Sequence, residues 1–253
     1  MFGLLCLVVL PFAGCRANKD GGEFFSVMAY NVGVFSKYSE SSMSEVAKLI
    51  LESGVCLVAL NELDSCNRRH DSYQLKEIAD SLGGWDYHFA SAFPYAGGAY
   101  GNGVLSRNPI LRRHRITLPR FDGAEQRSCA VVETEKFVFA STHLDHKGDT
   151  ARVAQVKMLN RWFSDYFAGY TKPVLLCGDM NCTPESEAVA ELLKCWTQLS
   201  GTEFTYSSKN PRKCIDYIFA LNSAGKVKNV SARVYTEAIE TSDHLPVVVK
   251  LSY

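Results

Sequence analysis

The sequence predicts an α/β fold in which two β-sheets pack face to face and helices cover their outer faces. Apolar runs of strand length alternate with segments of helical periodicity. A succession of strands followed by a helix occurs twice along the chain. The 253 residues, 47% of them hydrophobic, are enough to bury a large core. No linker, repeat or low-complexity stretch divides the chain, so we expect one domain.

The first predicted elements are a strand over Phe24 to Asn31 and a helix from about Ser44 to Glu52. The helix carries an apolar stripe made by Val46, Leu49 and Ile50. Ser42 and Glu45 have the spacing of a capping box, which predicts that they stabilise the start of this helix.

A strand over Val55 to Glu62 and a helix from about Ser72 to Leu82 follow. The helix is expected to close at Gly83-Gly84, because glycine adopts the left-handed conformation of a helix cap without strain. Four more strands are then predicted, the last two as a hairpin: Tyr87 to Ala90, Gly103 to Ser106, Cys129 to Thr134 and Phe137 to His143.

The longest predicted helix spans Thr150 to Phe167, with Val153, Val156, Leu159 and Phe163 on one side. A strand over Val174 to Asp179 and a helix from about Glu185 to Leu193 come next, and three more strands are expected to end the chain.

The charge composition argues against a general attraction to polyanions. Lysine plus arginine and aspartate plus glutamate number 27 each, so net charge draws the chain neither to nucleic acid nor to anionic membranes. Local basic clusters occur at Arg68 to His70, Arg112 to Arg115 and Lys209 to Lys213. They can bind phosphates, but such runs are more often solvated loops or edge strands.

The amino terminus predicts export. Residues 1–14 carry no charged side chain and contain an apolar run, Leu4 to Leu10, that is too short to span a bilayer. The end of this segment, Phe12-Ala13-Gly14-Cys15, resembles a bacterial lipobox, in which the cysteine becomes lipidated. We therefore expect a signal peptide over 1–14, a polar tether over 15–23 and a domain over 24–253. The protein would be a membrane-anchored bacterial lipoprotein, attached through its lipid only.

The cysteines do not predict a metal site. No C-x-x-C pair is present, so structural zinc is not expected. Without Cys6 and Cys15 an odd number remains, and Cys56, Cys129 and Cys177 lie in apolar strands, where a free thiol behaves as a small hydrophobe. An exported protein can still form a disulfide or two, with a pairing that the sequence does not give.

Polar side chains end six apolar segments, and this pattern predicts a functional site. If the strands lie side by side in two sheets, these termini meet at one edge. Carboxylates and amides suit Mg²⁺, and Mn²⁺ and Ca²⁺ share this preference. A metal ion with oriented imidazoles can activate water against a phosphate ester. The residues concerned are Asn31, Glu62, His143, Asp179, Asn181, Asp216, Asp243 and His244.

The motifs at these positions resemble the endonuclease/exonuclease/phosphatase superfamily, over about Phe24 to Tyr253. They are Ala29-Tyr30-Asn31, Asn61-Glu62-Leu63-Asp64, Tyr100 to Arg107, Ser141 to His146, Gly178-Asp179-Met180-Asn181, Ile215-Asp216-Tyr217 and Ser242-Asp243-His244. The resemblance implies the deoxyribonuclease I-like architecture, a four-layered sandwich of two mainly antiparallel sheets flanked by helices. It also implies a metal-dependent hydrolase, most simply a phosphodiesterase.

The resemblance further implies a role for each residue. Glu62 would be the principal metal ligand, with Asn31 and Asp243 beside it. Asp179 would position or deprotonate the attacking water, and Asn181 would hold a phosphate oxygen. The remaining catalytic groups would be His143 and His244, the latter oriented by Asp216. Weaker candidates for substrate contact are Asn102, Arg107 and Arg152. Asn61 departs from the family, which usually has glutamine there, and this can alter the support of the metal ligand.

The sequence leaves the substrate open. A nuclease of DNA or RNA should show a basic groove, which the charge composition does not indicate. A lipid phosphodiesterase of the sphingomyelinase type would need an exposed apolar hairpin, for which Ala92 to Tyr100 is the candidate. The same segment can instead shape a pocket for a small phosphorylated sugar or inositol. Export would suit scavenging of phosphate esters, and no protein partner is evident.

An alternative of another class is a catalytically idle binding module with the same fold. Such a module would have lost one or more of the residues that the chemistry needs. Glu62, Asp179, Asn181, Asp243 and His244 are all present, which favours an enzyme.

Overall fold

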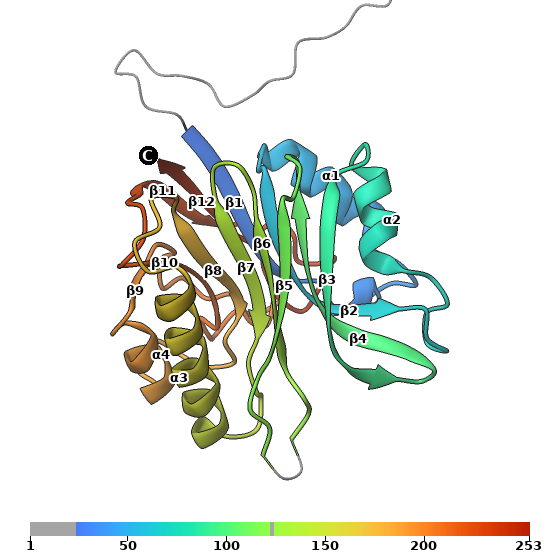
Figure 1. The fold of residues 1–253 in the computed structure, drawn as a ribbon. Coiled ribbons are helices and arrows are strands. Elements are labelled where there is room, and N and C mark those ends of the chain that lie inside the picture. Colours follow the sequence, from blue (N-terminus) through green and yellow to red (C-terminus); the bar gives the residue numbers. More distant parts are fainter. Residues whose placement is uncertain (1–23, 122–123) are drawn as a thin grey trace, which may run out of the picture.

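The computed structural model describes residues 24–121 and 124–253. The predicted signal peptide and tether lie outside these residues. Two six-stranded sheets pack face to face, and helices cover the outer face of each (Figure 1). The predicted four layers are therefore present.

The first sheet has the strand order β11-β12-β1-β2-β4-β3. β1 and β2 run parallel, and the other neighbouring strands are antiparallel. Its strands are β1 (Phe24–Asn31), β2 (Leu57–Ser65), β3 (Asp86–Tyr95), β4 (Gly98–Ser106), β11 (Lys228–Val234) and β12 (Val247–Ser252).

The second sheet has the strand order β5-β6-β7-β8-β10-β9. Here β7 and β8 are the parallel pair, and the other neighbours are antiparallel. Its strands are β5 (Arg112–Thr117), β6 (Ser128–Glu133), β7 (Val138–His143), β8 (Val174–Asp179), β9 (Trp196–Gln198) and β10 (Asp216–Leu221). Both sheets are thus mainly antiparallel, as expected.

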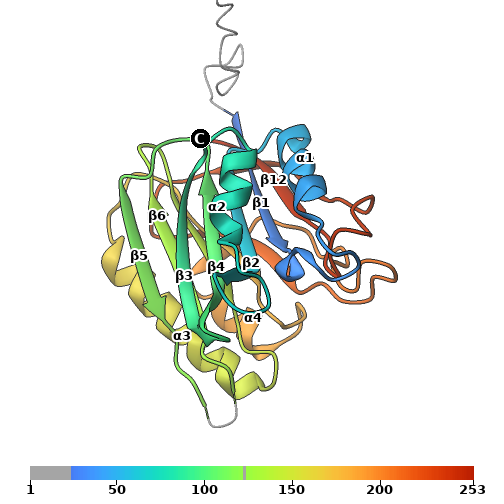
Figure 2. The same ribbon diagram turned by 90° about the vertical axis from the view of Figure 1, so that its right-hand side faces the viewer.

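Three apolar layers hold the sandwich together. Between the sheets, side chains such as Val27, Phe139 and Ile218 are buried, because alternate residues of each strand face inward. Helices α1 (Met43–Ser53) and α2 (Gln74–Ser81) bury one stripe each against the first sheet, and Figure 2 shows them in front of it. Helices α3 (Asp149–Tyr166) and α4 (Glu187–Leu192) do the same on the second sheet.

The helix ends agree only in part with the prediction. Gly83 and Gly84, with φ of 87° and 83°, follow α2 as expected. The capping box at α1 is wrong, because the Ser42 hydroxyl makes no cap hydrogen bond. It donates instead to the carbonyl of Thr241 at 2.7 Å. The start of α1 is thereby tied to the loop that carries Asp243.

Three segments test the strand predictions. The basic cluster at Arg112 to Arg115 is an edge strand, β5, which was one of the two expected readings. Among the described residues four strands, not three, follow α4, and Thr241 to Pro246 is a loop rather than a strand end. The segment Ala92 to Tyr100 continues β3 and β4 up to a tight turn at Ala96-Gly97.

No helix in the described part of the chain is both long and apolar enough to cross a membrane.

Candidate active site

The predicted polar residues meet at one edge of the sandwich. Asn31, His143 and Asp179 are the last residues of β1, β7 and β8, and β7 and β8 run parallel, with His143 beside Asp179. Asp216 is the first residue of β10, which runs antiparallel to β8, so it pairs with Asp179 in the register. The strand directions therefore bring His143, Asp179 and Asp216 together, and Asn31 joins them from the other sheet.

Glu62 reaches the same edge through an irregularity in β2. The pairing of β2 with β4 shifts register between Leu60 and Leu63, and Glu62 has a φ of 57°. A bulge of this kind re-aims a side chain, and a non-glycine residue in this conformation is strained. Here the strained residue is the predicted metal ligand, whose carboxylate lines the pocket.

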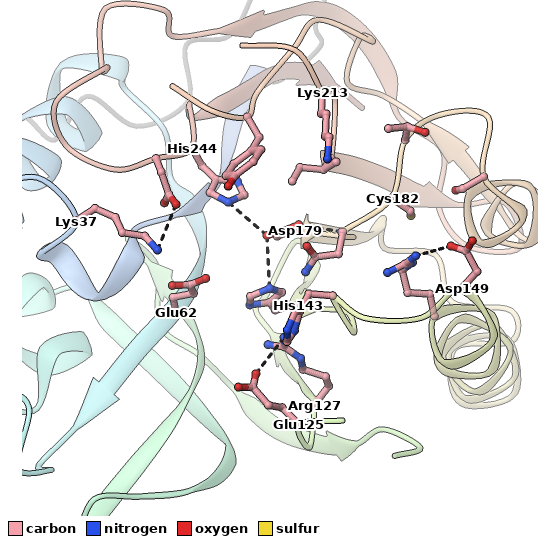
Figure 3. A pocket seen from close by; sticks show the side chains of 18 of the residues that line it. Lys37, Glu62, Glu125, Arg127, His143, Asp149, Asp179, Cys182, Lys213 and His244 are labelled. Atoms are coloured by element: carbon pink, nitrogen blue, oxygen red, sulfur yellow. Dashed lines mark hydrogen bonds and ion pairs between the residues drawn. The ribbon is translucent and has the colours of Figure 1, made fainter. Parts of the chain in front are cut away.

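Asp179 lies at the centre of the site (Figure 3). Its Oδ2 accepts a hydrogen bond from Asn31 Nδ2 at 3.1 Å, and its Oδ1 accepts one from the backbone N–H of Asn181 at 2.8 Å. The Nε2 atoms of His143 and His244 lie 3.4 and 3.6 Å from Asp179 Oδ2. One buried carboxylate therefore contacts both predicted catalytic imidazoles.

His244 is held by a second carboxylate. Its Nδ1 lies 2.9 Å from Asp216 Oδ2, and both side chains are nearly fully buried. Burial alone would lower the pKa of His244, but the charges of Asp216 and Asp179 outweigh burial and raise that pKa to about 10. His244 is therefore protonated at neutral pH.

The other two central groups titrate differently. Burial raises the pKa of Asp179 above its usual range, although the charge of His244 opposes this. Burial and the positive charge of Arg127 hold the pKa of His143 well below its usual range, so His143 is neutral. Environments that push the pKa values of neighbouring groups apart create one proton donor and one acceptor. His244 can therefore donate a proton in this site and Asp179 can accept one.

Asn61 supports the site from beneath. Its amide oxygen accepts from the backbone N–H of Asp179 at 2.9 Å. Its amide nitrogen lies within hydrogen-bond distance of Asn102 Oδ1, Ser141 Oγ and the Thr142 carbonyl, at 3.1, 3.2 and 3.0 Å. Asn61 thus joins the two sheets beneath Asp179. Its hydrogen bond holds the backbone of Asp179, not the neighbouring Glu62.

Gly178 is required for this arrangement. It has a φ of 133°, and an added Cβ would lie 2.0 Å from the Thr142 carbonyl oxygen and 2.9 Å from Asn61 Oδ1. Because no other residue fits this approach, the glycine of the Gly178-Asp179 motif has a structural reason.

The donors for a divalent cation lie beside this cluster. Glu62 and Asp243 both line the pocket with carboxylates, which suit a hard cation. In Asn31, Oδ1 accepts from the Gly33 amide at 3.1 Å and Nδ2 donates to Glu62 Oε1 at 3.2 Å. Asn31 therefore orients the Glu62 carboxylate in this structure, and its role as a ligand stays a prediction.

A second group with metal-binding chemistry is formed by Asp179, Asp216 and His244, whose ligand atoms lie within 4.8 Å of one another. In this group His244 Nδ1 already contacts Asp216 Oδ2 at 2.9 Å. Glu62 and Asp243 line the pocket, so their carboxylates are the other set of candidate donors for a cation.

The pocket has a volume of about 780 Å³ and extends beyond the central cluster. Arg152 lines it, and its guanidinium donates to the Asp145 carbonyl at 2.9 Å and pairs with Asp149. Arg127 also lines it, paired with Glu125 at 3.3 Å and lying 3.0 Å from His146 Nδ1. Arg152 was predicted because it follows His143 closely in the sequence, whereas Arg127 and Lys37 are single basic residues near no motif and carry no such signal.

Two of the weaker candidates lie elsewhere. Asn102 is buried below the pocket, where it donates to the Ser128 carbonyl at 2.9 Å. Arg107 is exposed and directly follows Ser106, which pairs with Leu57 at the start of β2. It is therefore at the sheet edge opposite Glu62, and its predicted contact with substrate has no support in the structure.

The cysteines of the described residues form no disulfide. This holds for Cys56, Cys66, Cys129, Cys177, Cys182, Cys195 and Cys214.

Comparison with known proteins gives consistent relationships. The family model described as "Endonuclease/Exonuclease/phosphatase family" matches residues 28–244. No curated protein sequence matches the chain. A solved mannosyl-6-phosphatase of Bacteroides thetaiotaomicron has a TM-score of 0.75 and 19% identity, and the match covers 90% of this chain and 100% of that one. For TDP2 of Caenorhabditis elegans the TM-score is 0.73, with 17% identity over 91% of this chain and 75% of that one.

A third solved structure extends the comparison. An endonuclease/exonuclease/phosphatase of Beutenbergia cavernae has a TM-score of 0.73 and 20% identity, over 90% of this chain and 71% of that one. At these identities the likeness shows the fold, and the family model gives the relationship.

Proposed function

Since this chain belongs to the endonuclease/exonuclease/phosphatase family, whose members hydrolyse phosphoester bonds, we propose that its pocket performs a divalent-metal-dependent hydrolysis of a phosphate ester. The observation that carries this proposal is the position of Asp179, between a protonated and a neutral imidazole and beside a pocket-lining Glu62. The proposed cation is Mg²⁺, for which Glu62 and Asp243 are the ligands of this chain.

The chain's own residues supply the proton chemistry. Asp179, whose basicity burial increases, accepts the proton of the attacking water. His244, protonated and held by Asp216, donates a charged hydrogen bond to the phosphate oxygens as negative charge develops. Asn181 and His143 line the pocket beside Asp179 and contact the same phosphate. When bound, the cation supplies Lewis-acid stabilisation of that charge.

The pocket favours a small substrate over a nucleic acid. It is lined by six acidic residues, four lysine or arginine residues and three histidines, and this mixed lining does not match a polyanionic strand. The hairpin from Ala92 to Tyr100 also packs on itself, with the Phe93 and Tyr100 rings 5.2 Å apart and Arg69 stacked 4.7 Å from the Tyr95 ring. Its residue Tyr100 lines the pocket. These contacts favour a pocket wall over a free membrane-inserting hairpin.

A phosphodiester remains the first candidate substrate, as the sequence predicted. A sugar phosphate monoester is the second, because a mannosyl-6-phosphatase has the same fold with a TM-score of 0.75. The proposed lipid anchor agrees with a soluble substrate. Phe24 and Asn31 lie at opposite ends of β1, about 23 Å apart at a rise of about 3.3 Å per residue, so an anchored domain can direct its pocket away from the membrane.

The test is a comparison of substrates under one metal condition. Purified protein with Mg²⁺ is given bis-p-nitrophenyl phosphate, mannose 6-phosphate, inositol phosphates, sphingomyelin, plasmid DNA and RNA, and product formation is measured. We expect kcat/KM for small esters to be at least tenfold higher than kcat/KM for nucleic acid, counted per phosphodiester bond. A factor of about ten is roughly what the loss of one charged contact with the substrate would cause. Preferred cleavage of DNA or sphingomyelin would reject the small-substrate proposal, and no turnover of any ester would favour the idle binding module.

A further inference from the structure

Lys37 reaches the proposed metal site from the loop after Gly33–Phe35, a 3₁₀ helix named η1. Its aliphatic stem lies across Gly33, where an added Cβ would be 2.6 Å from Lys37 Cγ and 3.1 Å from Cε. Gly33 also has a φ of 52°. A glycine at this position therefore leaves the space that the lysine stem fills.

The ammonium group of Lys37 pairs with a proposed metal ligand. Its Nζ lies 3.2 Å from Asp243 Oδ2, and the two side chains are 38% and 20% exposed. Figure 3 shows Lys37 on the same side of the pocket as Glu62, and a dashed line from its amino group marks this ion pair. Both carboxylates and the lysine line one pocket.

Hydrogen bonds hold the backbone at Asp243 in place. The Ser208 amide donates to its carbonyl at 2.7 Å, and the hydroxyl of the preceding Ser242 donates to the Asn31 carbonyl at 2.7 Å. A cation that binds Asp243 must therefore approach the same carboxylate that Lys37 contacts. Two positive charges at one carboxylate repel each other, and this lowers the affinity of each.

We propose that Lys37 is a built-in counter-ion of the Glu62–Asp243 pair, which competes with the metal ion for Asp243 and weakens metal binding. This inference rests on the metal site of the proposed function. Lysine suits this role because its ammonium is a point charge on a flexible stem, which can leave the carboxylate when another cation arrives.

The test is calorimetric titration of Mn²⁺ into the purified protein. Lys37→Met removes the charge and keeps the length of the side chain, so we expect Mn²⁺ to bind roughly tenfold more tightly. Lys37→Arg keeps the charge and should bind within about threefold of wild type. Lys37→Gln repeats the charge removal with a polar side chain, should Lys37→Met not fold.

Lys213→Met is the matched control. Lys213 lines the same pocket, and Figure 3 shows it on the far side of His244 from Lys37. Lys213→Met removes one positive charge from the pocket, as Lys37→Met does, but that charge does not contact Asp243. We therefore expect Lys213→Met to bind Mn²⁺ within about threefold of wild type, which would show that the effect of Lys37 comes from direct competition and not from the net charge of the pocket.

The outcomes separate the two proposals. If wild type binds Mn²⁺ and neither Lys37→Met nor Lys37→Gln binds it more tightly, the counter-ion role is wrong while the metal site stands. An equal gain in Lys213→Met also overturns it. If Mn²⁺ binding is detected in Lys37→Met or Lys37→Gln but not in wild type, the counter-ion role is supported. If none of the proteins binds Mn²⁺, the metal site fails, and the inference that rests on it fails too.

Discussion

Replacement of Asp216 by asparagine should lower the pKa of His244 with little change in shape. The Asp216 carboxylate lies 2.9 Å from His244 Nδ1, and its side chain is 0% exposed. Asparagine has nearly the same volume and can still accept a hydrogen bond from Nδ1 through its amide oxygen. The substitution therefore removes the charge of Asp216 and leaves a neutral partner.

The size of the effect follows from that contact. A hydrogen bond to a charged group contributes about 1.5–3 kcal/mol, and one pKa unit corresponds to about 1.4 kcal/mol. The pKa of His244, about 10 in the wild type, should fall by roughly 1–2 units in Asp216→Asn.

The sign for stability follows from the direction of this shift. A histidine whose folded pKa is raised stabilises the protein fully below its unfolded pKa, and that contribution is lost as pH rises through the folded value. Wild type and Asp216→Asn share one unfolded pKa, so the stability advantage of wild type should stay constant from about pH 6.5 to about pH 8–9, the folded pKa expected in the variant, and should shrink as the pH rises to about 10.

The assay is an NMR titration of ¹⁵N-labelled histidine side chains, combined with urea unfolding at several pH values. Glu133→Gln is the matched control, because Glu133 pairs with His114 at 2.9 Å, outside the pocket-lining residues. It should leave the His244 titration unchanged. An unaltered His244 pKa in Asp216→Asn would refute the assignment of Asp216 as the group that keeps His244 protonated.

Three further predictions test other parts of the site. Glu62→Gln should reduce metal-dependent turnover at least about 100-fold and abolish the rise in melting temperature on adding Mg²⁺, and a retained rise would remove Glu62 from the metal site. Asn61→Ala should lower the free energy of unfolding in urea by roughly 2–4 kcal/mol, because it leaves the buried backbone N–H of Asp179 without its hydrogen-bond acceptor. A decrease of less than about 1 kcal/mol would contradict the role of Asn61 in holding Asp179. Arg152→Ala should lower kcat/KM about tenfold while Arg107→Ala leaves it within about twofold, since only Arg152 lines the pocket, and equal effects would contradict that difference.

The strand pattern of the sequence predicted the main features of the site. The apolar runs ending at His143 and Asp179 are neighbouring parallel strands, so their last residues lie side by side, and the run ending at Asn31 reaches the same site from the other sheet. Asp216 reaches the same edge from the start of an antiparallel strand. Its position could not be predicted in this way, because the residue types along one segment do not reveal the direction in which its strand runs.

Other features depend on contacts between distant segments, which local patterns do not encode. Ser42 and Glu45 have capping spacing, yet the Ser42 hydroxyl donates to Thr241 because the tertiary fold brings that carbonyl within 2.7 Å. The bulge that turns Glu62 toward the pocket and the pairing of Lys37 with Asp243 were not predicted for the same reason. The motif around Tyr100 to Arg107 predicted a contact at Arg107, but β4 carries that residue away from the site.

The central claim is that Asp179 and His244 form the acid–base pair of a phosphoester hydrolase. Its most direct test is the Mg²⁺-dependent turnover of bis-p-nitrophenyl phosphate by wild type, Asp179→Ala and His244→Ala, each checked for folding by circular dichroism. Each substitution should lower kcat by about 10²–10⁴-fold, the usual contribution of a general acid or base. Folded variants that turn over the ester at the wild-type rate would contradict the claim.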